Sequence, residues 1–146
     1  MTNAPYRLSE GLLLEESGNL LPWFRSLQQI TNKGGNPLPE KGKRSQLFWE
    51  AEKVFGGLNV SIQAMERGSG IFFLDLRHGR KFECAKEEYE ADLEILKGKF
   101  GEPTDAGDDE GYPWARWRWG DVCLNLALAE RFMDYVALSV SKGVIE

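Results

Sequence analysis

Apolar residues recur along this chain with two periods, and each period predicts a different kind of element. Two segments, opening at Leu21-Pro22 and at about Lys86, carry apolar residues at spacings of three and four, which places them on one face of a helix. Each segment is followed by glycine, which commonly terminates helices. The apolar positions are Trp23, Leu27 and Ile30 in the first segment and Tyr89, Leu93, Leu96 and Phe100 in the second. The sequence therefore predicts two helices.

Alternation of apolar and polar residues predicts strands that bury one face. Such alternation runs from Leu58 to Leu76 and again from Val122 to Val140, with a break inside each stretch. The alternating positions are Leu58, Val60, Ile62, Ala64, Phe72, Leu74 and Leu76 in the first stretch, and Val122, Leu124, Leu126, Leu128, Val136, Leu138 and Val140 in the second. Each stretch thus predicts two strands.

A further strand is predicted before each stretch, although one of the two has a second interpretation. Tyr112–Trp119 is expected to be extended. Leu47–Phe55 also fits a helix, because its apolar residues Leu47, Ala51, Val54 and Phe55 would share a helical face. We interpret it as a strand because it occupies the same place in the first half as Tyr112–Trp119 does in the second.

The two groups of elements follow one plan. A shift of 66 positions aligns the helices and the following Gly-x-Pro segments, and a shift of 64 then aligns the strands. Agreement between helix phase, turn and strand phase is stronger evidence than any one of them alone. The predicted fold class is α+β, a mainly antiparallel sheet with two helices packed on one face, built as a tandem pseudo-repeat of helix, loop and three strands. In plan it resembles other tandem small α+β repeat proteins, including some protein inhibitors, with which it shares no motif.

Composition and charge narrow the class of protein. The 146 residues, 42% hydrophobic and 28% charged, suit a single domain over 1–146 with internal halves of about 11–76 and 77–146. A net charge of −5 argues against nucleic acid as a partner and favours a basic protein. No apolar run is long enough to cross a bilayer. Two cysteines, Cys84 and Cys123, are few for a secreted scaffold, so we expect a cytoplasmic protein with reduced thiols, although a disulfide between them would also fit.

No residue pattern identifies an enzyme, a cofactor or a metal site. The one histidine, His78, falls in a predicted turn, so nucleophilic triads and zinc sites lack the residues that they need. The glycine pairs form neither a phosphate-binding nor a dinucleotide-binding loop. The acidic run that begins at Asp105 has Gly107 and Arg116 where a calcium loop needs oxygen ligands. We therefore expect no catalytic residues, no cofactor and no metal.

The candidate binding residues lie mainly in the second half. If residues 112–119 are extended, Trp117 and Trp119 pack on a helix while the alternate side chains face outward. Trp and Arg are frequent in interface hot spots, and a sheet that is apolar on both faces is either covered or used. The candidate partner surface comprises Trp114, Arg116 and Arg118, the acidic loop Asp108, Asp109 and Glu110, and the outward Ile71, Phe73 and Tyr135.

These features favour a binding protein over an enzyme. The leading hypothesis is a small cytoplasmic protein-binding module, for example an immunity or antitoxin-type inhibitor, that presents the acidic loop and the Trp/Arg strand to a basic protein. One alternative is an aromatic surface that binds nucleic acid or glycan by stacking on Trp114, Trp117 and Trp119. Another is self-association as a structural homodimer with no separate ligand.

Overall fold

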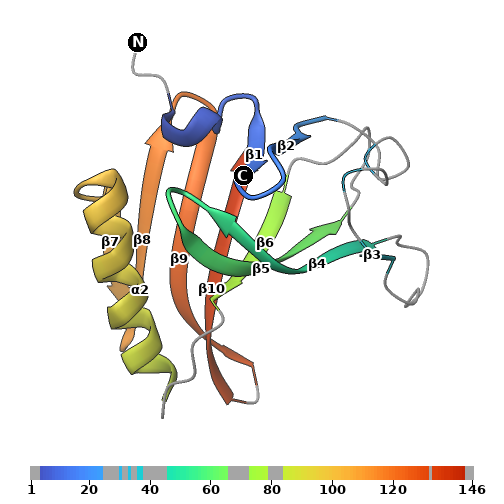
Figure 1. Cartoon of the computed structure of the whole chain (residues 1–146). Helices are drawn as coiled ribbons and strands as arrows, with labels where there is room; N and C mark the ends of the chain where they lie inside the picture. The colour runs from blue at the N-terminus through green and yellow to red at the C-terminus, as the bar shows by residue number, and fades with distance from the viewer. Residues whose placement is uncertain are drawn as a thin grey trace.

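The computed structural model describes residues 4–24, 30, 33, 36–37, 46–65, 73–78, 84–131 and 133–143. A short 3-10 helix precedes a hairpin, four further strands, one α-helix and four more strands (Figure 1). The elements are η1 (Pro5–Arg7), β1 (Gly11–Leu14), β2 (Asn19–Pro22), β3 (Asn36–Pro37), β4 (Gln46–Val54), β5 (Leu58–Met65), β6 (Phe73–His78), α2 (Ala85–Phe100), β7 (Asp105–Asp109), β8 (Tyr112–Trp119), β9 (Val122–Arg131) and β10 (Met133–Lys142).

Eight of the strands form one antiparallel sheet in the order β3-β4-β5-β6-β10-β9-β8-β7. We call β3–β6 the first meander and β7–β10 the second meander, because neighbouring strands follow one another along the chain within each. The meanders join through β6 and β10. The strands β1 and β2 form a separate two-stranded sheet.

The prediction of two helices packed on one face is wrong. The structure gives the bounds of one α-helix, α2, which matches the predicted second helix, while Ile30 is a single described helical residue in the range of the predicted first helix. Leu21 and Pro22, predicted to open the first helix, belong to β2, where Leu21 pairs with Leu12 of β1. A cross-strand pair that buries Leu21 to 1% exposure outweighs a helical period carried by only a few apolar residues. Residues 25–29, within that predicted helix, lie outside the described residues.

The tandem plan of helix, loop and three strands is corrected in the same way. Each meander contributes four strands instead of three, since β3 and β7 add an outer strand that the alternation did not reveal. The strands predicted at 47–55 and 112–119 are present as β4 and β8, which resolves the helical interpretation of the former. The proposed division into halves near residue 76 stays a prediction.

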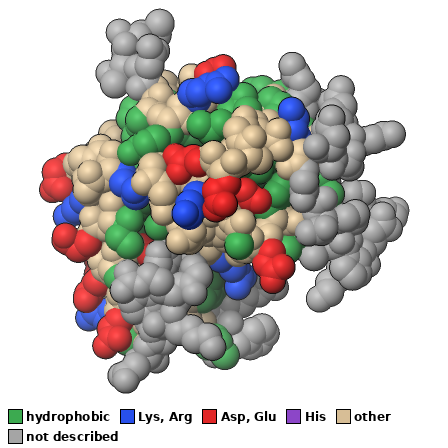
Figure 2. Space-filling model, viewed as in Figure 1, with side chains coloured by type: hydrophobic (Ala, Val, Ile, Leu, Met, Phe, Trp, Pro, Cys, Tyr) green, Lys and Arg blue, Asp and Glu red, His purple; other side chains and the backbone are tan. Residues whose placement is uncertain are grey.

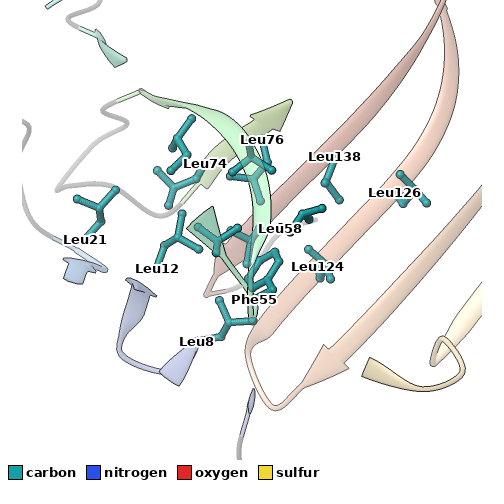
Figure 3. Packing of buried hydrophobic residues seen from close by; sticks show 14 of the residues in the cluster. Leu8, Leu12, Leu21, Phe55, Leu58, Leu74, Leu76, Leu124, Leu126 and Leu138 are labelled. Atoms are coloured by element: carbon teal, nitrogen blue, oxygen red, sulfur yellow. The ribbon is translucent and has the colours of Figure 1, made fainter. Parts of the chain in front are cut away.

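The helix α2 and the N-terminal segment supply the second layer of the fold. The helix contacts β9 and β10, and β1 contacts β4 (Figure 1). Leu8, Leu12 and Leu21 lie on the same side of the sheet as Leu124 and Leu138 (Figure 3). We call the side of the large sheet that faces this layer the inner face and the opposite side the outer face.

An aromatic cluster links the two layers at the end of α2. Phe100 packs edge-on against Tyr6 of η1 and Phe55, with ring centroids 5.4 and 5.1 Å away. It also contacts Trp117 and Trp119 of β8. Because these rings come from η1, the β4–β5 turn, α2 and β8, both meanders share one core.

The turn between β4 and β5 is held by a carboxylate from the N-terminal hairpin. Phe55, Gly56 and Gly57 all have positive φ, so consecutive backbone N–H groups point to one place. Glu15 accepts hydrogen bonds from Gly56 N and Gly57 N at 2.6 and 2.7 Å. This contact fastens the N-terminal hairpin to the first meander.

Charged side chains of both signs lie on the exposed side of α2, at the left of the molecule (Figure 2). Glu87 and Glu88 lie in its first turn and Lys97 and Lys99 in its last, which is the order that the helix dipole favours. Among the described residues, no helix is both long and apolar enough to span a membrane.

Candidate binding surface

Strand β8 divides its side chains between the two faces of the sheet. On the inner face Trp117 is 1% exposed, and its indole Nε1 donates a hydrogen bond to the carbonyl of Gly101 at 2.9 Å. Trp119 packs on Phe100 of α2. Because side chains alternate along a strand, Trp114, Arg116 and Arg118 lie on the outer face. This is the division that the sequence predicted.

Trp114 and Arg116 hold each other in place on that face. The guanidinium carbon of Arg116 lies 4.7 Å from the centre of the Trp114 ring, a cation–π distance. The indole also lies against Gly107 of β7, where a Cβ would come within 2.7 Å of it. Arg116 Nε donates to Asn125 Oδ1 at 3.1 Å, which is a second contact on the same guanidinium group. The pair is therefore preorganised before any partner arrives.

Arg118 is fixed from the edge of the sheet. Its Nε lies 3.4 Å from Asp105 Oδ2, and its backbone N–H donates to Thr104 Oγ1 at 3.0 Å. Both charged side chains are about half exposed (51% and 50%), so water screens this ion pair. The contact orients Arg118 more than it stabilises the fold.

A pocket of about 270 Å³ opens on the outer face between β8, β9 and β10. The register builds it from two rows of residues across these strands. One row is Arg116, Asn125 and Ser139, and the other is Arg118, Cys123 and Ser141. Burial raises the pKa of the Cys123 thiol, and the nearby Arg118 and Arg116 work in the opposite direction. Neither Cys123 nor Cys84 forms a disulfide.

The acidic loop forms the tip of the β7–β8 hairpin. Asp108, Asp109 and Glu110 are all exposed, but they have different roles. Asp108 Oδ1 accepts the Gly111 N–H at 2.6 Å and so shapes the turn. No hydrogen bond or ion pair involves the side chains of Asp109 and Glu110 in the part of the chain that is described. These two carboxylates are available to a partner.

Next to the tip, Tyr112 bridges two carboxylates. Its phenol donates to Glu130 Oε2 at 2.7 Å and lies 3.1 Å from Asp134 Oδ1. These acceptors disfavour the phenolate and raise the pKa of Tyr112 to about 12. Glu130 and Asp134 are direct cross-strand partners, so the shared phenol offsets the repulsion between them.

Of the predicted apolar part of the site, the structure places the side chain of Tyr135 alone, and it does not lie beside the arginines. Tyr135 is 41% exposed but pairs with Ala129, four residues along β9 from Asn125, the partner of Arg116. It lines a different hollow, with Glu88 of α2. Phe73 pairs with Ser141 through its backbone, while its side chain and all of Ile71 lie outside the described residues.

Sequence reasoning missed the three polar residues that line the pocket beside the arginines. Asn125, Ser139 and Ser141 occupy the outward positions of alternating strands, and that alternation was visible in the sequence. The missing information was the register, which decides that these residues neighbour Arg116 and Arg118.

Comparisons with known proteins add no family to this description. No protein-family model matches the chain, and neither a curated protein nor a solved structure was found to be similar to it. Among the described residues, no group of three or more His, Cys, Asp or Glu side chains could hold a metal ion. Geometry and charge are therefore the features of the molecule that bear on its function.

Proposed function

We propose that this protein is a small protein-binding module that uses the outer side of its second meander, acting as an immunity or antitoxin-type inhibitor of a basic protein. The observation that carries the proposal is the position of a fixed Trp114–Arg116 pair on β8, a few residues from the exposed acidic tip of the same hairpin. We define the hairpin surface as Asp109, Glu110, Trp114, Arg116 and Arg118.

The parts of the hairpin surface would contribute differently to binding. Tryptophan and arginine dominate interface hot spots when they are desolvated, and Trp114 and Arg116 already share one geometry. Rim carboxylates mainly accelerate the encounter with a basic partner, and Asp109 and Glu110 lie at such a rim. The net charge of −5 acts in the same direction. The free thiols support the cytoplasm as the compartment.

The alternative function, binding of nucleic acid or glycan by stacking on three tryptophans, is less well supported because two of the three face the inside of the fold. Trp117 is buried on the inner face, and Trp119 packs on Phe100 there. Trp114 already lies against Gly107 and Arg116 of its own chain. A base or sugar would have to displace these contacts, so the geometry supports protein recognition better.

The test is affinity capture from native lysate followed by kinetics with the captured protein. We expect Trp114→Ala to weaken binding by about 30-fold or more, the effect of losing a hot spot of about 2 kcal/mol. We expect Asp109→Asn/Glu110→Gln to slow association about tenfold at low salt, with little change in dissociation.

The matched control is Glu16→Gln/Glu50→Gln, which removes the same charge from exposed positions outside the hairpin surface. It should bind like the wild type. If capture returns no protein whose binding depends on Trp114, or if the control slows association as much as the tip variant, the proposal is wrong.

A further inference from the structure

We infer that the pocket between β8, β9 and β10 is a binding site for a small oxyanion, a carboxylate or phosphate group held by Arg116, Asn125, Ser139 and Ser141. This site goes beyond the proposed protein-binding function, because a free small molecule would suffice to occupy it. Four observations lead to it: two serine hydroxyls that open onto the pocket, a set of hydrogen-bond donors, the balance of charge and the size of the pocket.

Two serine hydroxyls open onto the pocket. Ser139 is 8% exposed and Ser141 is 5% exposed as whole residues, and both line the pocket. Neither side chain makes a hydrogen bond within the described chain, and neither hydroxyl oxygen is among the fully enclosed atoms that lack a partner. Both hydroxyls are therefore available as donors to a ligand that enters the pocket.

The remaining lining groups are mostly donors. Arg116 uses Nε on Asn125 Oδ1, which leaves the two terminal nitrogens of its guanidinium for a ligand. Because the amide oxygen of Asn125 is the acceptor in that bond, its NH₂ group stays available as a donor. A guanidinium, an amide NH₂ and two hydroxyls around one space match the acceptor-only surface of an oxyanion.

The charge balance leaves Arg116 as the cation that attracts the anion. Asp121 lines the pocket and lies 3.8 Å from Lys142 Nζ, and Asp105, the cross-strand partner of Arg116, lies 3.4 Å from Arg118 Nε, so each carboxylate has a cation beside it. Arg116 contacts no carboxylate among the described residues. Asp75 lies opposite Ser139 on β6 but is not one of the residues that line the pocket.

The volume limits the ligand. At about 270 Å³ the pocket lies just below the range of about 300–1,000 Å³ typical of sites for drug-sized ligands. It suits inorganic phosphate or a short carboxylic acid better than a drug-sized ligand.

The experiment is an amide NMR titration of the full chain with sodium phosphate and, separately, with succinate, at constant ionic strength maintained with sodium chloride. We expect saturable shifts at Asn125, Ser139 and Ser141 with at least one of the two anions. Saturation with phosphate alone assigns a tetrahedral anion, and saturation with succinate alone assigns a carboxylate. Shifts that rise linearly with both anions, or that occur elsewhere, would overturn the proposal.

Variants separate a built site from general attraction of anions. Arg116→Gln should weaken binding about tenfold or more, because a charge-assisted bidentate contact is lost. Ser139→Ala and Ser141→Ala, which leave the charge unchanged, should each weaken it about three- to tenfold. The control Arg7→Gln removes one positive charge at an exposed position in η1 and should bind as the wild type does. Equal losses in Arg7→Gln and Arg116→Gln would contradict the site.

Discussion

The first and second meanders bury a tryptophan in the same way but present different outer faces. Trp49 of β4 donates to the carbonyl of Lys33 at 3.1 Å, and Trp117 of β8 donates to that of Gly101 at 2.9 Å. Each acceptor precedes its donor by 16 residues. On the outer face, the residue before the buried tryptophan is Phe48 in the first meander, paired with Gln63, and Arg116 in the second, paired with Asn125.

This difference shows which residues packing constrains. An inner tryptophan with a carbonyl partner fills a fixed space in a close-packed core, so its replacement is costly in either meander. An outer side chain has no such constraint and is free to acquire a binding role. The junction between β6 and β10 is also symmetric, because Leu74 pairs with Val140 and Leu76 pairs with Leu138. This reciprocal pairing is expected if Leu74 is equivalent to Leu138 and Leu76 to Val140, each 64 positions further along the chain. The divergence of the outer faces is therefore informative about function.

The comparison is tested most severely by truncating the inner tryptophans. Trp49→Ala and Trp117→Ala should each lower the free energy of unfolding by about 3–5 kcal/mol, because each leaves a large cavity and an unsatisfied carbonyl. Urea denaturation followed by circular dichroism measures both. A cost below about 1 kcal/mol for one of them would show that the meanders are not packed alike.

The carboxylate of Glu15 distinguishes the meanders, because it caps the β4–β5 turn of the first. Glu15→Gln should destabilise the protein by about 1–3 kcal/mol, since it weakens two charge-assisted hydrogen bonds to Gly56 N and Gly57 N. The exposed neighbour Glu16→Gln is the control and should change stability by less than about 0.5 kcal/mol. Equal losses of stability in Glu15→Gln and Glu16→Gln would show that Glu15 does not cap the turn.

Gly107→Ala tests whether the Trp114 indole is held in place on the outer face of the second meander. A Cβ at this position would come within 2.7 Å of the Trp114 indole, so the ring must move away from Arg116. We expect a cost of about 1–3 kcal/mol in stability and a changed tryptophan fluorescence spectrum. Gly98→Ala on α2 meets nothing within 4 Å and should stabilise the protein slightly, by up to about 1 kcal/mol. An unchanged fluorescence spectrum in Gly107→Ala would show that the indole is not held there.

The smallest expected effect concerns Tyr112 at alkaline pH. Its pKa is raised from 10.0 to about 12, so the protonated phenol stabilises the folded state. This contribution is complete below pH 10 and is lost as the pH rises through about 12. Ultraviolet absorbance titration should show a late-ionising tyrosine that is absent in Tyr112→Phe. Identical titration curves above pH 10 would contradict the bridge to Glu130 and Asp134.

The strands were more predictable than the helices or the site. Alternation located β5, β6, β9 and β10, because a strand with one buried face imposes a period of two. The strand at Leu21 was missed because the helical spacing of Trp23, Leu27 and Ile30 favours a helix there, although Leu21 pairs with Leu12, only nine residues away. The division of β8 into Trp117 and Trp114 faces followed from sequence, whereas the neighbours Ser139 and Ser141 required the register across three strands.

The measurement that tests the central claim most directly is hydrogen exchange, followed by mass spectrometry, in the complex with the captured partner. The account predicts added protection in β7 and β8, residues 105–119, and no added protection in β4 and β5, residues 46–65. Edge strand β7 should respond most, because its outer backbone groups are not paired within the sheet. Protection confined to β4 and β5, with unchanged exchange in β7 and β8, would place the binding surface on the first meander and contradict the account.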